Sequence, residues 1–282
     1  MAFQPKIRSR SSLNKRRWRN VGILALVVSA LWAWLYHQQQ NLQRDSFTSG
    51  YILIGTVLFL AAYNIRKFLP FIPWLGSSAS WMQFHIYVGL GSFFVFLWHV
   101  GLKLPNGIFE SCLAALYVIV FGSGLLGLFW TRTIPRRLTA IGEQVIFEQI
   151  PLLRRQLVRQ VHDLLFLSPA KSVVLCRFYV QRLAGFFEQA RPVSYLVRPS
   201  GHACRALLSE IEDLDRYLSP PHRDAGRKLA EMVRRKDDLD YHLALQGRLK
   251  IWLFAHIGLT YSLVIVAIVH GVMVHAFHGG LP

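Results

Sequence analysis

The sequence has few cysteines and few acidic residues, and five long stretches of it contain almost no charge. Its three cysteines, Cys112, Cys176 and Cys204, form no CxxC motif, so they define neither a disulfide framework nor a zinc knuckle. Asp and Glu number 15 against 32 Lys and Arg, which gives a formal net charge of +17 over 282 residues. Yet 53% of the residues are hydrophobic and the mean hydropathy is +0.32. This combination argues against a soluble globular domain, a disordered chain and a secreted disulfide scaffold.

The apolar residues are concentrated in five runs. Each run is long enough, or nearly so with its flanks, to cross the ~30 Å of hydrocarbon in a bilayer. The runs cover residues 20–36, 50–65, 82–102, 112–130 and 251–277. Gln38, Gln39 and Gln40 follow the first run and do not resemble a signal-peptide cleavage site, so we interpret it as a membrane helix. The sequence therefore predicts an all-α membrane protein with a bundle of five transmembrane helices.

The charges between these runs alternate from one side of the membrane to the other. The N-terminal segment, the 66–81 loop and the 131–250 segment together carry all of the net +17, while the other two loops and the tail sum to zero. Lys and Arg accumulate in cytoplasmic loops, so we expect an inner (plasma) membrane protein with a cytoplasmic N-terminus and a periplasmic C-terminus. Because these bases line membrane edges and no nucleic-acid motif occurs, the expected partner is anionic lipid and not nucleic acid.

The predicted organisation has four parts: a basic cytoplasmic segment (1–19), four transmembrane helices (20–130), a helical cytoplasmic insert (131–249) and a fifth transmembrane helix with a short external tail (250–282). Pro135 is expected to begin a helix over 136–167. A long helix is expected from about Pro221 through Lys250 into the last span. The mixed-charge stretch 234–238 is interpreted as a solvated helix face, or alternatively as a docking surface. The insert contains no GxGxxG, Walker or HExxH motif.

Four histidines lie in the third and fifth predicted membrane helices at one spacing. His85 and His99 are fourteen residues apart, and so are His256 and His270. Fourteen residues make close to four helical turns, so each pair lies on one face, about 21 Å apart along the axis. Because both helices run from the cytoplasm outward, His85 matches His256 in depth near the inner surface, and His99 matches His270 near the outer surface.

Imidazoles inside a bilayer are costly and indicate a functional site. Two facing nitrogen ligands with no Cys or carboxylate suit neither structural zinc nor a closed copper site. A porphyrin already supplies four nitrogens and needs only two axial ligands, so two b-type haems account for all four histidines. Two alternatives remain open: a proton relay or transition-metal transport cluster, and ordinary packing by each histidine. His37, His275 and His278 lie at the outer ends of the predicted helices. Two interpretations stay open for them: an acceptor or metal site at the outer face, or interfacial residues.

The two His-x13-His pairs on helices three and five resemble the membrane domain of ferric reductases and NADPH oxidases. This resemblance implies two stacked haems b between helices three and five, with His85 and His256 on the inner iron and His99 and His270 on the outer iron, and electron flow outward. The pattern is also similar to the cytochrome b of quinol-oxidising complexes, where the ligands lie on helices two and four. The family usually has a sixth helix followed by a flavin and NAD(P)H domain, and neither is found in this sequence.

We therefore expect a dihaem membrane cytochrome that acts as an electron-transfer component of an oxidoreductase. Its donor would be a quinol or a partner protein docked on the 131–249 insert. Its acceptor would be external: ferric iron, oxygen or a periplasmic cytochrome. The alternative hypothesis is a membrane anchor or a transition-metal transporter that uses the intramembrane histidines without haem.

Overall fold

The structure, a computed structural model, describes residues 10–40, 45–63, 77–103, 105, 107–141, 145–167 and 172–277. These residues are almost entirely helical and include no strand. The α-helices are α1 (Arg10–Gln40), α2 (Asp45–Ala62), α3 (Ser78–Val100), α4 (Ile108–Thr139), α5 (Ile150–His162), α6 (Val173–Phe178), α7 (Ala184–Glu188), α8 (Val193–Val197), α9 (His202–Asp215) and α10 (Pro220–Phe277). The prediction of an all-α protein is confirmed for this part of the chain.

Within the described residues, four helices are long and apolar enough to cross a membrane. They are Trp18–Gln40 within α1, all of α3 and α4, and His222–Phe277 within α10. The second predicted span corresponds to Ser46–Ala62 of α2, which is apolar but shorter. Its helix begins before the predicted Gly50 and ends before Ile65. These helices are typical of a membrane protein.

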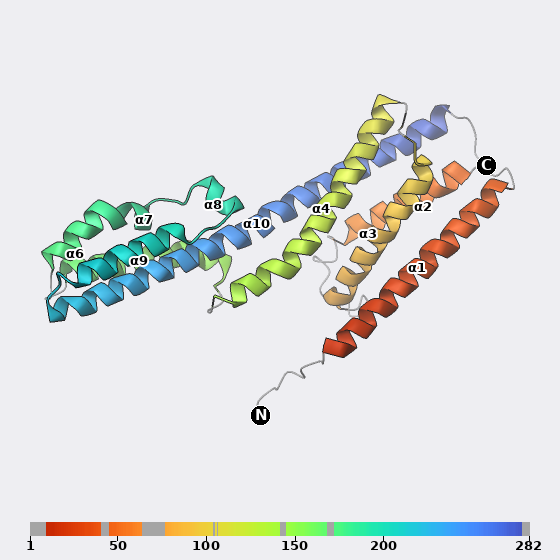
Figure 1. Ribbon diagram of the computed structural model, residues 1–282. Helices are drawn as coiled ribbons and strands as arrows, with labels where there is room; N and C mark the ends of the chain where they lie inside the picture. Colours follow the sequence, from red (N-terminus) through yellow and green to blue (C-terminus); the bar gives the residue numbers. More distant parts are fainter. Residues whose placement is uncertain are drawn as a thin grey trace. The chain divides into compact units, whose positions relative to one another are not determined.

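The chain divides into two compact units, and the first comprises 1–125 and 255–282. Its core joins four helices through Val57 of α2, Phe96 of α3, Tyr117 of α4 and Leu263 of α10. Figure 1 shows α2 and α3 side by side in this unit, and the two helices contact each other along their length. An edge-to-face contact between the Trp32 and Trp98 rings adds α1 to the bundle.

Helix α3 is fixed at both ends by capping residues. At its start, the Ser77 hydroxyl accepts a hydrogen bond from the Ser80 amide, as N-cap residues do. At its end, Gly101 adopts φ 66°, and its amide donates to the carbonyls of Leu97 and Trp98. Glycine enters this left-handed region without steric cost. The helix therefore stops immediately after His99, which places that histidine in its last turn.

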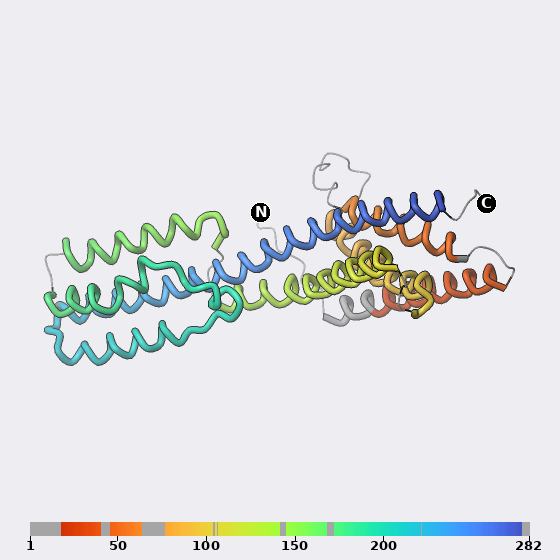
Figure 2. The backbone as a smooth tube through the Cα atoms, turned by 90° about the horizontal axis from the view of Figure 1, so that it is seen from above, coloured from red at the N-terminus to blue at the C-terminus, as the bar shows by residue number. Residues whose placement is uncertain are grey.

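The second unit comprises residues 126–254 and has a separate hydrophobic core. Helices α5, α6, α7 and α9 lie along the N-terminal half of α10, as Figures 1 and 2 show. Residues at the centre of this core are Val161, Leu183, Leu229 and Val233, all with no exposed surface. The long uninterrupted helix predicted from about Pro221 is confirmed, because α10 runs from Pro220 to Phe277.

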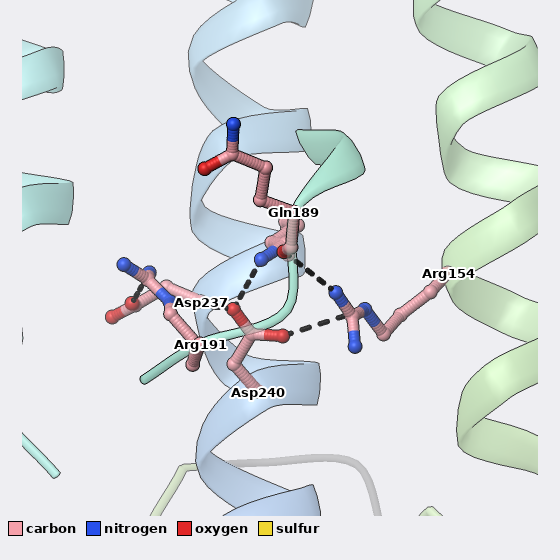
Figure 3. Close-up of polar contacts among 6 residues, drawn as sticks. Arg154, Gln189, Arg191, Asp237 and Asp240 are labelled. Atoms are coloured by element: carbon pink, nitrogen blue, oxygen red, sulfur yellow. Dashed lines mark hydrogen bonds and ion pairs between the residues drawn. The ribbon is translucent and has the colours of Figure 1, made fainter. Parts of the chain in front are cut away.

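A buried ionic network crosses the second unit and corrects the interpretation of residues 234–238 as a solvated face at Lys236, whereas Arg234 is exposed. Lys236 and Asp240 are each about 1% exposed and form an ion pair. Arg191 donates to Asp240 Oδ2 at 2.8 Å and to Asp237 Oδ1 at 2.9 Å, and Arg154 of α5 approaches Asp240 Oδ1 at 3.5 Å. Figure 3 shows these groups converging on α10. These charged side chains can lie in the core because each is paired with a group of opposite charge.

Pro135 does not begin a helix, contrary to the sequence prediction. It lies inside α4, four residues before the helix ends at Thr139. Proline has no amide hydrogen, so the carbonyl of Thr131 loses its helical donor. The adjacent Ile134 is only 2% exposed, and we attribute the extra turn to its burial. The next α-helix begins at Ile150, preceded by a 3₁₀ turn over Phe147–Gln149.

Candidate functional site

The first unit brings His85 of α3 and His256 of α10 together. The two imidazoles are close enough to interact electrostatically. The ring of His85 lies 5.1 Å from that of Tyr63, at the C-terminal end of α2. Nδ1 of His85 is buried without a hydrogen-bond partner. A buried polar atom in this state is costly unless a further group completes the site. The pairing of these two histidines as one site stays a prediction.

His256 is held by two consecutive residues of α4. The hydroxyl of Ser123 lies 3.1 Å from Nδ1 of His256. The next residue, Gly124, presents bare backbone to the same ring: a Cβ there would lie 3.6 Å from Cε1 of His256. The serine orients the imidazole, and the glycine lets the ring lie directly against the helix.

His99 is held in the same way by two consecutive residues of α2. The hydroxyl of Ser49 lies 3.1 Å from Nδ1 of His99, and a Cβ on Gly50 would lie 3.1 Å from Cε1 of the ring. Ser49 is completely buried and donates its hydroxyl proton to the carbonyl of Ser46. Its oxygen therefore accepts from Nδ1–H of His99. The neutral imidazole then carries its lone pair on Nε2, the tautomer that presents Nε2 to a metal.

We call each of these arrangements a Ser–Gly cradle: Ser49-Gly50 for His99 and Ser123-Gly124 for His256. One cradle serves each level, and each acts on a different ligand helix. Sequence reasoning did not identify either cradle. The available signal was the repeated Ser-Gly pair within apolar runs, which a hydropathy pattern does not distinguish from ordinary helix packing.

His270 has a different environment from His99 and His256. Its ring lies 6.2 Å from that of Phe109, near the start of α4. Along α4, Phe109 lies beside His270 and Ser123 lies beside His256. This order is the reverse of the order of the two histidines along α10, as expected for antiparallel helices. In the same way, Ser49 of α2 lies beside His99, and Tyr63, directly after α2, lies beside His85. Each of the two histidine-bearing helices is therefore paired with an antiparallel neighbour, α3 with α2 and α10 with α4.

A packed aromatic layer separates the two levels. Ser92, halfway between His85 and His99, is 3% exposed, and its hydroxyl lies 2.8 Å from that of Tyr117. The Tyr117 ring stacks on Phe96 with centroids 4.2 Å apart. Leu263, halfway between His256 and His270, packs into the same cluster. A packed, low-dielectric region therefore lies between His85 and His99 on α3 and between His256 and His270 on α10.

The remaining histidines considered at the outer helix ends have different surroundings. His275 contacts Tyr51 of α2, and His37 lies in the last turn of α1. His278 lies outside the described residues. Among the remaining glycines of the histidine-bearing and neighbouring helices, Gly55, Gly122, Gly258 and Gly271 have no heavy atom within 4 Å of an added Cβ, so no close approach to a neighbouring helix explains them.

Among the described residues, no group of three or more His, Cys, Asp and Glu side chains is arranged to hold a metal ion. The histidines are present as pairs and single residues. No family model, curated protein or solved structure matches the chain. The functional argument therefore depends on the geometry of the histidines and on their neighbours.

Proposed function

We propose that the protein is a dihaem b-type membrane cytochrome that moves electrons across an inner membrane. His85 and His256 would hold the inner haem, and His99 and His270 the outer one. The proposal includes five membrane spans, with α2 as the second, a cytoplasmic location for the second unit and an external C-terminus. The loop charges support this orientation, since +17 of net charge lies on one side.

The observation that carries this proposal is the pair of Ser–Gly cradles. Each cradle binds Nδ1 of one histidine and leaves the ring edge against bare backbone. Hydrogen bonding at Nδ1 is the usual way in which proteins orient a ligating histidine and strengthen its Nε2 as a ligand. The recurrence of the same two residue types against a histidine on two different helices is what favours ligation over ordinary packing.

The residues at each level fit a b-type haem. Two imidazole ligands complete the coordination of an iron porphyrin, which when bound supplies one-electron redox chemistry. Between the levels, Ser92, Tyr117 and Phe96 exclude water, because their side chains are packed into one core cluster or bonded to it.

The electron donor would be a quinol or a cytoplasmic protein that docks on the second unit. The acceptor would be ferric iron, oxygen or a periplasmic cytochrome at the outer face. Anaerobic reduction of the purified protein by a quinol analogue, and separately by NADPH with candidate flavoproteins, distinguishes the two classes of donor. Reduction by the quinol analogue alone would favour the first class.

Haem content and spectroscopy test the proposal directly. Purified protein from cells supplied with ample haem is expected to contain about two haems per chain and to show reduced b-type bands of a low-spin, bis-histidine iron. His256→Ala and His270→Ala should each remove one haem, and different ones. His242→Ala is the control, since His242 is a buried histidine of the second unit. A colourless wild-type protein that binds a transition-metal ion through these histidines would instead establish the transporter hypothesis.

A further inference from the structure

Tyr51 of α2 and His275 of α10 form a hydrogen-bonded pair beyond the four proposed ligands. The phenol oxygen of Tyr51 lies 2.6 Å from Nε2 of His275. Nδ1 of the same ring lies 2.7 Å from the carbonyl oxygen of Gly271. Because a carbonyl only accepts, Nδ1 carries a hydrogen, and Nε2 of the neutral ring accepts from the Tyr51 hydroxyl. The proton positions of the pair follow from these two contacts.

The pair lies next to the His99–His270 level on both of its helices. Tyr51 follows Gly50, whose backbone lies against the ring of His99. Gly271, which accepts from His275, follows His270 in the chain. Phe47 packs edge-to-face on His275, with ring centroids 5.7 Å apart. His275 is exposed and Tyr51 is 56% exposed, so the pair lies on the surface of the helix bundle near the C-terminal end of α10.

A protonated His275 would keep both of its hydrogen bonds. Nδ1–H continues to donate to the Gly271 carbonyl, and the new Nε2–H donates to the Tyr51 oxygen once the phenol hydrogen turns away. Neither ring has to move, so the imidazolium is accommodated without an unsatisfied donor. A buried centre that gains an electron favours a compensating positive charge nearby, and His275 is positioned to supply it.

We propose that His275, positioned by Tyr51, takes up a proton when the His99–His270 level is reduced and releases it when that level is oxidised. This inference rests on the proposed function. One electron from the donor and one proton from external water enter together. The electron then passes to the acceptor, and the proton returns to water or accompanies the electron. His275 is thus assigned to charge compensation and not to iron ligation.

Other titratable groups lie at the same helix ends as His275 and Tyr51, and their charges bear on the protonation of His275. On α2, the side chains that contact His275 are Tyr51 and the apolar Phe47. On α10, the nearest preceding titratable residue is His270. The remaining described titratable groups at the ends of α1, α3 and α4 are Tyr36, His37, His99, Lys103, Glu110 and Cys112. Among the described residues, Tyr51 is the titratable side chain that contacts His275.

Redox titration of the outer haem at several pH values tests the inference, with this haem identified as the one lost in His270→Ala. In the wild type its midpoint potential should fall with rising pH, by up to about 59 mV per pH unit where one proton accompanies one electron. His275→Gln should abolish this slope, whereas His37→Gln, a histidine at the end of α1, should preserve it. Tyr51→Phe should move the sloping range to lower pH, because the imidazolium then loses one of its acceptors.

The outcomes separate the two proposals. A wild-type protein without haem contradicts the proposed function, and with it the basis of this inference. A protein with two haems whose outer potential does not depend on pH, or retains its slope in His275→Gln, overturns the inference and leaves the cytochrome proposal intact. If His275→Gln fails to retain the outer haem, Tyr51→Phe decides, and an unchanged sloping range in that variant refutes the role of the pair.

Discussion

The Ser49 hydroxyl accepts a hydrogen bond from Nδ1–H of His99 while it donates its own proton to the Ser46 carbonyl. This relationship fixes a tautomer that no sequence pattern could assign. It also orients the ring, because Gly50 removes the Cβ that would otherwise lie 3.1 Å from Cε1. On α4 the same two residue types act on His256. The two levels are therefore supported by similar chemistry delivered from different helices.

Removing each serine should affect only its own level. Ser49→Ala is expected to weaken haem binding at the outer level about 10-fold or more and to raise its midpoint potential, because the unsupported imidazole is a weaker ligand for ferric iron. Ser123→Ala should do the same at the inner level. Haem titration and optical redox titration measure both effects. Ser262→Ala, which removes only a hydroxyl bonded to the Gly258 carbonyl, should leave both haems unchanged.

Adding one methyl group to α2 distinguishes a cradle glycine from an ordinary one. Gly50→Ala places a Cβ 3.1 Å from Cε1 of His99, whereas Gly55→Ala meets nothing within 4 Å. Gly50→Ala is therefore expected to displace the ring and lower outer-haem occupancy, while Gly55→Ala preserves occupancy and slightly favours the helix. Pyridine haemochrome assays of the two variants provide the comparison. Equal haem loss in both would show that α2 does not support His99.

A second close approach joins α4 and α10 within the second unit. A Cβ on Gly127 would lie 1.7 Å from Cζ2 of Trp252, so Gly127→Ala forces the indole to move. We expect it to destabilise the protein by about 1–3 kcal/mol or more, seen as a lower Tm of the purified protein. Gly122→Ala on the same helix meets no atom within 4 Å and is the control. Trp252→Leu combined with Gly127→Ala should recover part of the loss.

The sequence was sufficient for properties that follow from periodicity. Apolar runs predicted the long helices, which is confirmed for α3 and α10. The fourteen-residue spacing predicted one face for each histidine pair, and the loop charges predicted that His85 and His256 share a level, which stays a prediction. The four histidines as haem ligands remain a prediction. The serines of the cradles were missed because their role depends on which helices are neighbours, and spacing along one helix does not contain that relationship.

The burial of Lys236 and Asp240 was also missed, although a signal was present. Leu229, Val233, Lys236 and Asp240 follow one another at spacings of four, three and four residues, which is one stripe of a helix. The first two are fully buried core residues, and the stripe continues through the two charges. Charge alone indicated solvent, whereas position indicated the core. Because Arg154 and Arg191 arrive from distant segments, the compensation for burying them could not be read locally.

Neutralising Asp240 should strongly destabilise the second unit. Asp240→Asn leaves Lys236 buried without its carboxylate and weakens the contacts of Arg154 and Arg191. Breaking a buried ion pair from one side costs about 3–5 kcal/mol. Thermal unfolding and limited proteolysis between residues 126 and 254 should both report the loss. Asp224→Asn removes only an exposed pair with Arg227 and should change stability by less than about 1 kcal/mol.

Thiol labelling provides a pH-dependent test of the same core. Burial, assisted by the negative charges of Asp237 and Asp238, raises the pKa of Cys204 to about 11 from a reference of 9.0. Since the thiolate is the reactive form, this shift alone makes the thiolate population at pH 8 about 100-fold lower than for a thiol at the reference value, and burial slows access further. Cys112 is exposed and should react with iodoacetamide first, as peptide mass mapping can show.

The same pKa shift also predicts how stability depends on pH. A raised thiol pKa means that the folded state retains a proton that the unfolded state has lost between about pH 9 and 11, so this contribution to stability is full below pH 9 and declines across that range. Labelling of Cys204 should therefore accelerate steeply as pH rises through this interval, and in denaturant it should approach the rate of Cys112. If the two cysteines react equally fast in native protein at pH 8, α9 does not pack on α10 in the way described.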